Sequence, residues 1–268
     1  MSIEVYGISN EVKLKHFYEP DLGLFIAESP NVIERALNAG YIAESFLVEE
    51  RYLGSKEGQL IKRCPEAEVY LVDEDSKKQI TGYPMTRGML AAMRRKHLPD
   101  VDELLGLEDA KQFHRIVILE DVVNPTNVGA IFRSAAALGM DAILLSSACT
   151  DPLYRRAVRV SMGTVFQIPW TYMSDSNSRW IDAWGVKLKE QGYKLVSMAL
   201  RDDTVDIDDP CLLKEEKLAI ILGTEGEGLN SDTISKSDMT VKIPMYAGVD
   251  SLNVAAASAV AFWQLRYR

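Results

Sequence analysis

The chain has few of the residues from which metal sites and disulfide frameworks are built. Its 268 residues include three cysteines and three histidines, and both sets are scattered along the sequence. Neither set shows the close ligand spacing of a zinc site, and three distant cysteines do not make a disulfide framework. We therefore expect no metal, no histidine-based catalytic centre and a reducing, cytoplasmic location.

Long apolar runs, repeats and low-complexity tracts are also absent from the sequence. No run is long enough to span a bilayer, and the first residues lack the basic and apolar regions of a signal peptide. We expect neither a membrane span nor a signal peptide. With 47% hydrophobic and 26% charged residues, the composition is typical of a globular protein with one large domain or two ordinary ones.

An excess of positive charge is missing as well. The formal net charge of −9 argues against broad, non-specific binding of nucleic acid. Residues 1–112 hold 14 basic against 20 acidic side chains, and residues 113–268 hold 16 against 19, so neither half is basic. Any contact with nucleic acid therefore needs local clusters of basic residues. Such a cluster can also be simply the solvated face of a helix. The candidates are Arg94, Arg95, Arg155 and Arg156.

Hydrophobic patterning predicts two domains, each with strands and helices. In the first, we expect strands at 24–27, 45–49 and 69–73 and helices at 31–38 and 88–96. A polar stretch with Pro99 follows and indicates a linker. We place the domain boundary near residue 112.

The second domain, residues 113–268, alternates strands and helices more regularly. We expect strands at 115–120, 141–145, 165–168, 194–198, 218–222 and 239–243, and helices at 128–138, 179–191 and 252–265. Such alternation indicates right-handed crossovers and a mostly parallel sheet with both faces covered. Ligands bind such sheets in the loops that leave the strand ends.

Three polar, glycine-rich loops follow strands in this domain. In the first, Asn127 suits a helix N-cap, and Arg133 can reach back over Gly129 because helical side chains tilt toward the N-terminus. An arginine there suits a phosphate or a developing oxyanion. An ordinary surface arginine on an amphipathic helix is the alternative.

The second loop has the sequence Leu-Gly-Thr-Glu-Gly-Glu-Gly-Leu at residues 222–229. Glycine permits close approach of the backbone to a ligand. The loop is not a phosphate loop, because no Lys-Ser/Thr follows and carboxylates repel phosphate. A cationic or hydroxyl-bearing ligand fits better, and a tight turn with solvated acids is the alternative.

The third loop precedes the last helix. Pro244 ends a strand, and Asp250 or Ser251 can cap the helix that follows. Asn253 is unusual in an apolar run, because Asn disfavours helix interiors. A structural cap and a satisfied core asparagine are the alternative to a functional role.

Together the three loops resemble the SpoU/TrmH family of SPOUT-class RNA methyltransferases. The pattern Asn-x-Gly-x-x-x-Arg stands at 127–133, Gly-x-Glu-Gly-x-Gly-Leu at 223–229 and Ile-Pro-Met…Ser-Leu-Asn-Val at 243–254. This ordered set is highly specific and covers about residues 113–268. Residues 1–112 look, less specifically, like the smaller L30e-type substrate-binding domain of many members. One departure is Asp250, where Glu is commoner in the family.

The resemblance implies an α/β fold with a deep trefoil knot in the C-terminal domain and a homodimer whose sites are completed across the interface. It implies transfer of a methyl group from S-adenosylmethionine (AdoMet) to a ribose 2′-hydroxyl of tRNA or rRNA, without a metal. The implied cofactor-binding residues are Leu222, Gly223, Ile243, Met245 and Leu252.

The resemblance also implies a catalytic set around Arg133. Its other members, which orient Arg133 and the ribose, are Asn127, Glu225, Ser251 and Asn253. Because a guanidinium is essentially always protonated, we expect Arg133 to stabilise the alkoxide and phosphate while the proton leaves to solvent or phosphate.

Two other functions follow from the same resemblance. One is a non-catalytic RNA-binding SPOUT homologue that acts in ribosome or RNA assembly, against which the intact Arg133, Glu225, Ser251 and Asn253 argue. The other is a SPOUT enzyme that methylates a base, and Arg133 together with Ser251-Leu-Asn253 favours ribose chemistry instead.

Overall fold

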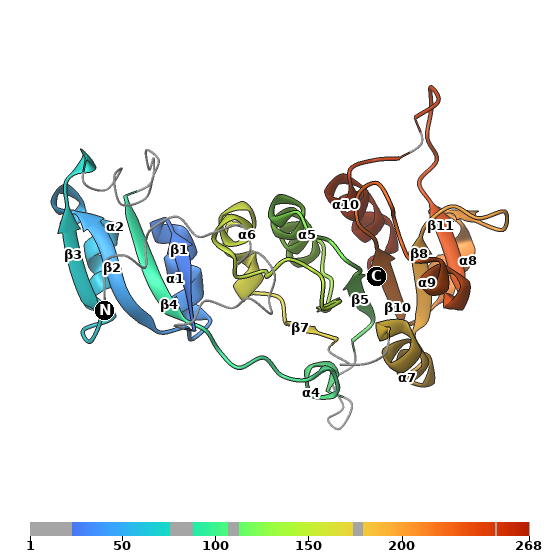
Figure 1. Cartoon of the computed structure of the whole chain (residues 1–268), viewed down its shortest axis with the longest axis horizontal. Helices are drawn as coiled ribbons and strands as arrows, with labels where there is room; N and C mark the ends of the chain where they lie inside the picture. The colour runs from blue at the N-terminus through green and yellow to red at the C-terminus, as the bar shows by residue number, and fades with distance from the viewer. Residues whose placement is uncertain (1–22, 76–87, 107–112, 174–178, 250, 268) are drawn as a thin grey trace. The chain divides into compact units, whose positions relative to one another are not determined.

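A computed structural model describes residues 23–75, 88–106, 113–173, 179–249 and 251–267. The chain forms two compact units, Met1–His97 with Asp151–Gln167, and Leu98–Thr150 with Ile168–Arg268 (Figure 1). The boundary between the two compact units follows His97. The boundary expected from the sequence was near residue 112. The stretch after His97 contains helix α4 (Val101–Leu105), whose apolar side chains are buried in the core of the second unit.

The first unit is built on a four-stranded sheet. Its strands are β1 (Leu24–Glu28), β2 (Ala43–Glu49), β3 (Glu68–Val72) and β4 (Met89–Arg94), in the order β1-β4-β2-β3. Only the β2–β3 pairing is parallel. Its helices are α1 (Pro30–Asn38), α2 (Lys56–Lys62) and α6 (Arg155–Val160), with short 3₁₀ helices η4 (Glu50–Tyr52) and η5 (Thr164–Phe166). The three strands predicted before residue 75 and the helix at 31–38 are confirmed.

The helix predicted at 88–96 is wrong, because Met89–Arg94 forms strand β4. Met, Leu and Ala favour helices in isolation, and that propensity misled the prediction. In the fold, β4 lies between β1 and β2 and pairs with both. Residues 89–93 are fully buried, so burial on both faces of a central strand overrides the local preference.

Residues 151–167 belong to the first unit although they connect two strands of the second. The Asp151 carboxylate accepts a hydrogen bond from Arg95 and forms an ion pair with it. The Met162 carbonyl accepts a hydrogen bond from Arg35 Nη1 at 2.6 Å. The Phe166 ring packs on Tyr41, with ring centroids 5.1 Å apart. A strand predicted at 165–168 is wrong, since Thr164–Phe166 is a 3₁₀ turn and the strand starts at Trp170. A short apolar run does not distinguish the two conformations.

The second unit contains a seven-stranded sheet in which all strands are parallel, and the alternating pattern predicted a mostly parallel sheet. The strand order is β7-β6-β5-β10-β8-β11-β9. The strands are β5 (Arg115–Leu119), β6 (Ala142–Leu145), β7 (Trp170–Tyr172), β8 (Lys194–Met198), β9 (Val205–Asp206), β10 (Leu218–Leu222) and β11 (Met239–Lys242). Because β5 and β10 are neighbours and β11 is two strands further, the loops that leave these three strands meet at one edge of the sheet.

Helices cover both faces of this sheet, as the alternating pattern predicts. In Figure 1, α5 (Pro125–Ala137) and α10 (Val254–Leu265) lie together above the sheet, and α7 (Val186–Glu190) lies below it with α4. The remaining helices are α8 (Pro210–Lys214), α9 (Ser231–Lys236) and the π-helical turn η6 (Ile181–Gly185). Among the described residues, no helix is long and apolar enough to cross a bilayer.

Candidate active site

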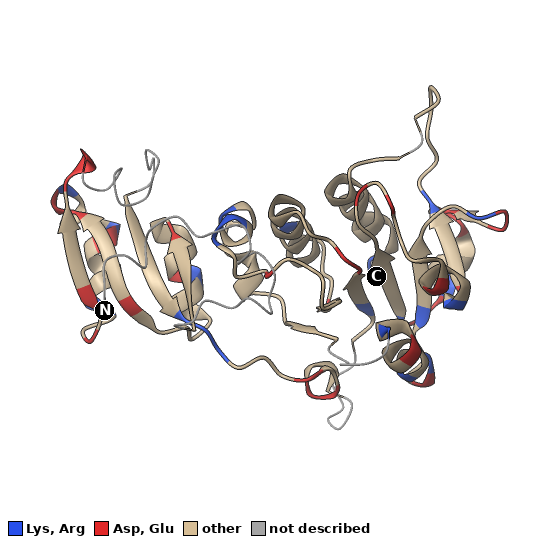
Figure 2. Cartoon of the chain, viewed as in Figure 1, with Lys and Arg blue, Asp and Glu red and all other residues tan. Residues whose placement is uncertain are grey.

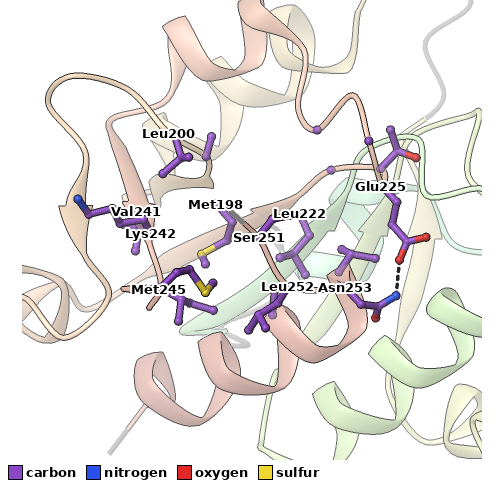
Figure 3. A pocket seen from close by; sticks show the side chains of 18 residues that line it. Met198, Leu200, Leu222, Glu225, Val241, Lys242, Met245, Ser251, Leu252 and Asn253 are labelled. Atoms are coloured by element: carbon purple, nitrogen blue, oxygen red, sulfur yellow. Dashed lines mark hydrogen bonds between the residues drawn. The ribbon is translucent and has the colours of Figure 1, made fainter. Parts of the chain in front are cut away.

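A pocket of about 440 Å³ opens where the loops after β10 and β11 meet the start of α10 (Figure 3). All five residues expected to bind a cofactor line it: Leu222, Gly223, Ile243, Met245 and Leu252. Three of the five expected catalytic residues, Glu225, Ser251 and Asn253, line it as well. Two sequence motifs, at residues 223–229 and 243–254, therefore build one cavity.

The lining of this pocket is mainly apolar. Beside the expected residues it includes Met198, the last residue of β8, Leu200, which follows that strand, and Val241 of β11. Of the lining residues in the described ranges, Glu225 and Lys242 carry the charged side chains. An apolar cavity with a few polar groups is the usual form of a small-molecule site.

The glycine loop after β10 closes on itself. A Cβ atom on Gly223 would lie 2.5 Å from the carbonyl carbon of Gly228 and 2.7 Å from the nitrogen of Leu229. Inside the loop, Thr224 and Gly228 pair, and the Gly228 N–H donates to the Thr224 carbonyl at 3.2 Å. Glycine at 223 is thus required by backbone contact between the two ends of the loop.

Asn253 joins the three loops. Its Oδ1 accepts from the Ala255 N–H at 2.9 Å and caps α10. Its Nδ2 donates to Asn127 Oδ1 at 3.2 Å. The same Nδ2 donates to the carboxylate of Glu225, the hydrogen bond drawn in Figure 3. The prediction that Asp250 or Ser251 caps α10 is therefore not met: Asn253 is the cap, and Asp250 lies outside the described residues.

Asn127 lies inside a helix rather than at its start. The N-cap of α5 is Asn124, whose side chain accepts from the Thr126 N–H at 2.9 Å, so the prediction of Asn127 as the cap is wrong. Pro125 has no N–H and starts the helix three residues earlier than expected. This places Asn127, 5% exposed, against Asn253, while its own Nδ2 is buried without a hydrogen-bond partner in the described structure.

Arg133 lies on the exposed side of α5 and is not among the residues that line the pocket. Within the described ranges, no carboxylate forms an ion pair with it. The structure therefore brings Asn127, Glu225 and Asn253 into contact within one chain, and it leaves Arg133 available to a group outside that chain.

The four arginines suggested for nucleic-acid contact lie in the first unit, at the end of β4 and on α6, where Figure 2 shows basic residues gathered. Arg94 pairs with Glu44 and its side chain is 62% exposed. Arg95 is 9% exposed and pairs with Asp151, and Arg155 approaches buried Glu28 at 3.6 Å. Contact through Arg95 or Arg155 requires those pairs to open, whereas Arg94 and Arg156 are exposed.

Sequence reasoning missed Glu120, which follows β5. It is 4% exposed and accepts hydrogen bonds from Trp180 Nε1 at 2.6 Å and from the Asn230 N–H at 2.7 Å. A carboxylate at the end of an otherwise apolar strand was the signal that could have found it. Among the described residues, no group of three or more His, Cys, Asp or Glu side chains is arranged to hold a metal ion.

Comparisons with known proteins agree with this geometry. Residues 114–263 match the model of the SpoU rRNA methylase family. An uncharacterized tRNA/rRNA methyltransferase of Mycobacterium tuberculosis is 34% identical over 253 residues, which are 91% of this chain and 83% of that protein. A 23S rRNA (guanosine(2553)-2′-O)-methyltransferase of Bacillus subtilis is 26% identical over 242 residues, 90% of this chain and 88% of that protein.

Solved structures share the fold. An AdoMet-bound rRNA methyltransferase from Sinorhizobium meliloti superposes with a TM-score of 0.77 at 21% identity, covering 97% of each chain. The family match includes all three sequence motifs, two of which line the pocket, and spans more than half of the sequence. The chain belongs to the SpoU rRNA methylase family.

Proposed function

We propose that the protein transfers a methyl group from AdoMet to a ribose 2′-hydroxyl of tRNA or rRNA. The observation that carries the proposal is the contact of Asn253 with both Asn127 and Glu225 at the pocket, which assembles the three family motifs in one place. The name of the B. subtilis relative and the AdoMet in the S. meliloti structure support it. We place the reaction in the cytoplasm with its RNA substrate.

The residues of the pocket fit AdoMet. A cavity of about 440 Å³ is within the range of small-molecule sites. Leu222, Ile243 and Leu252 offer apolar surface to an adenine ring and a methionine chain, and Gly223 lets the backbone approach closely. The Glu225 carboxylate suits ribose hydroxyls or a positive sulfonium. When bound, AdoMet supplies a methyl group that is already activated, so the protein mainly aligns the reactants.

The side chains of this chain then have distinct tasks. Asn253 orients Glu225 and Asn127 through its Nδ2. Arg133 stabilises the developing alkoxide and the neighbouring phosphate through its permanent charge. The proton of the hydroxyl leaves to solvent or phosphate, because a guanidinium does not accept it.

A homodimer through the second unit accounts for the position of Arg133. The outer face of α10 exposes Val260 (40%) and Trp263 (57%), and an exposed aromatic beside aliphatic surface is typical of an interface. Arg133, exposed on the neighbouring helix α5, then reaches the pocket of the second copy. We also propose that the second unit contains the trefoil knot of the family. In the first unit, we propose that Arg94 and Arg156 contact the RNA.

The proposal is tested by methyl transfer from labelled AdoMet to total RNA from a strain that lacks this gene, with wild type and Arg133→Ala compared. Label that depends on Arg133 supports the enzyme. Absence of label, with AdoMet bound and the dimer formed, indicates an RNA-binding homologue instead. Absence of AdoMet binding contradicts the proposed function altogether.

A further inference from the structure

One buried carboxylate belongs to a residue that is bonded to the pocket wall at Leu222 but does not line the pocket. Glu120 follows β5, is 4% exposed, and has no basic ion-pair partner among the residues that the structure covers. Burying an unpaired carboxylate is costly unless hydrogen bonds compensate it. Here three donors converge on it: Trp180 Nε1 at 2.6 Å, the Asn230 N–H at 2.7 Å, and the hydroxyl of Thr233.

These contacts hold both ends of the glycine loop. The Glu120 N–H donates to the carbonyl of Leu222 at 2.9 Å, where the loop begins. The Glu120 carboxylate accepts from the N–H of Asn230, where the loop ends and α9 starts. Glu120, directly after the neighbouring strand β5, therefore binds the last residue before the loop and the first residue after it.

The loop held in this way carries residues that form the pocket wall. Thr224, Glu225, Gly226 and Gly228 all line the pocket, and Glu225 is bonded to Asn253. A displacement at Asn230 would move the backbone of Gly228 and Leu229, against which Gly223 packs without room for a Cβ. The geometry of the pocket wall thus depends on the Glu120 carboxylate.

We propose that Glu120 is a positioning residue for the cofactor: it fixes the 223–229 loop, and with it Glu225, in the conformation that binds AdoMet. This inference rests on the proposed function. The carboxylate is required because an N–H group faces each of its two oxygens, Asn230 N–H on Oε1 and Trp180 Nε1–H on Oε2. A glutamine of equal size presents an NH₂ group to at least one N–H donor and leaves that donor unsatisfied.

The test compares Glu120→Gln with Tyr193→Phe in the full-length protein. Tyr193 donates from its hydroxyl to the Phe113 carbonyl at 2.9 Å, near the opposite ends of the strands. Its loss removes one hydrogen bond of the same unit without touching the loop. We expect Glu120→Gln to weaken AdoMet binding about tenfold in calorimetry, with the KM for RNA unchanged, and Tyr193→Phe to bind AdoMet as wild type does.

A second pair of variants covers the case in which Glu120→Gln does not fold. Trp180→Phe and Thr233→Val each remove one donor and keep the carboxylate on Asn230, so each should weaken AdoMet binding by a smaller factor, about threefold. AdoMet affinity equal to wild type in these two and in any folded Glu120→Gln overturns the inference.

Hydrogen exchange separates this inference from the proposed function. Amides of residues 223–230 should exchange faster in Glu120→Gln, or in Trp180→Phe, than in wild type and Tyr193→Phe, whether or not AdoMet binds. If wild type binds no AdoMet, the proposed function fails, and unchanged exchange in the loop would also reject its anchoring by Glu120.

Discussion

Asn253 Nδ2 lies 3.2 Å from Asn127 Oδ1, although 126 residues separate the two asparagines. The same Nδ2 donates to Glu225, and Oδ1 of the same side chain caps α10. One amide group therefore performs a structural task with its oxygen and connects the motifs of the site with its nitrogen.

The two tasks of Asn253 can be separated by substitution. Asn253→Asp keeps an oxygen that caps α10, but it sets a second carboxylate against Glu225. Asn253→Ala removes both contacts. We expect Asn253→Asp to unfold near the wild-type temperature and Asn253→Ala to lose about 1 kcal/mol of stability, while both lose about 100-fold in methyl-transfer rate. Thermal unfolding and single-turnover transfer measure these effects. Full activity of Asn253→Asp would disprove the role of its nitrogen.

Gly223 is expected to tolerate no side chain. An alanine Cβ would lie 2.5 Å from backbone atoms of Gly228, so the loop must move, and we expect AdoMet affinity to fall about tenfold or more. Gly54→Ala is the matched control, because nothing lies within 4 Å of its added Cβ. Calorimetric titration of both variants with AdoMet measures the effect. Equal affinities of the two variants for AdoMet would show that the loop accommodates the added methyl group.

The exposed face of α10 predicts a dimer. Trp263 is 57% exposed and lies under the guanidinium of Arg266, 3.6 Å from the ring centroid. Trp263→Asp should convert a dimer into a monomer in light scattering, because a buried aromatic at an interface contributes about 2 kcal/mol or more. Ile42→Asp, at a 60% exposed site of the first unit, should leave the dimer intact. A monomeric wild type contradicts the proposed assembly.

Complementation tests whether Arg133 acts across that dimer. Arg133→Ala and Asn253→Asp are each expected to be inactive alone. If Arg133 serves the pocket of the second copy, mixed dimers of the two variants contain one intact site, and refolded equal mixtures recover about one quarter of wild-type activity. If Arg133 serves its own chain, the mixture stays inactive. The transfer assay on mixed and unmixed samples distinguishes the two arrangements.

The ion pairs of two neighbouring arginines, Arg94 and Arg95, should contribute very differently to the stability of the fold. Arg95 is 9% exposed and pairs with Asp151, which is 3% exposed. Asp151→Asn removes the negative charge that faces the buried Arg95 guanidinium and should lower the free energy of unfolding by about 3 kcal/mol. Glu44→Gln breaks the pair with Arg94, whose side chain is 62% exposed, and should cost less than about 1 kcal/mol. Urea unfolding of both variants checks this, and equal losses would contradict the assignment.

The sequence was most informative where strands are buried and loops carry motifs. Leu218–Leu222 and Lys194–Met198 were predicted to the residue. The first is a continuous apolar run that follows Lys217 and ends before Gly223, which leaves little choice for its conformation. Gly223, Glu225 and Asn253 were singled out because glycine, acid and amide residues are unusual beside such runs. The structure brings them to one pocket.

The errors arose where tertiary contacts override local preference. Met89–Arg94 has helix-forming residues and is a central strand. Asn127 was read as a cap because it precedes an apolar helix, yet Pro125 starts that helix and Asn127 faces Asn253. Glu120 was overlooked since its partners, Trp180 and Asn230, lie 60 and 110 residues away in sequence. Periodicity and propensity contain no such long-range information.

The central claim is that the methyl group goes to a ribose oxygen of RNA. The most direct measurement is mass analysis of nucleosides from RNA of a strain that lacks this gene, treated with AdoMet and wild-type protein or Arg133→Ala. We predict one 2′-O-methylated nucleoside, at a position that resists alkaline cleavage, with wild type and none with the variant. A methyl group on a base, or none on RNA although AdoMet is bound, would contradict the account.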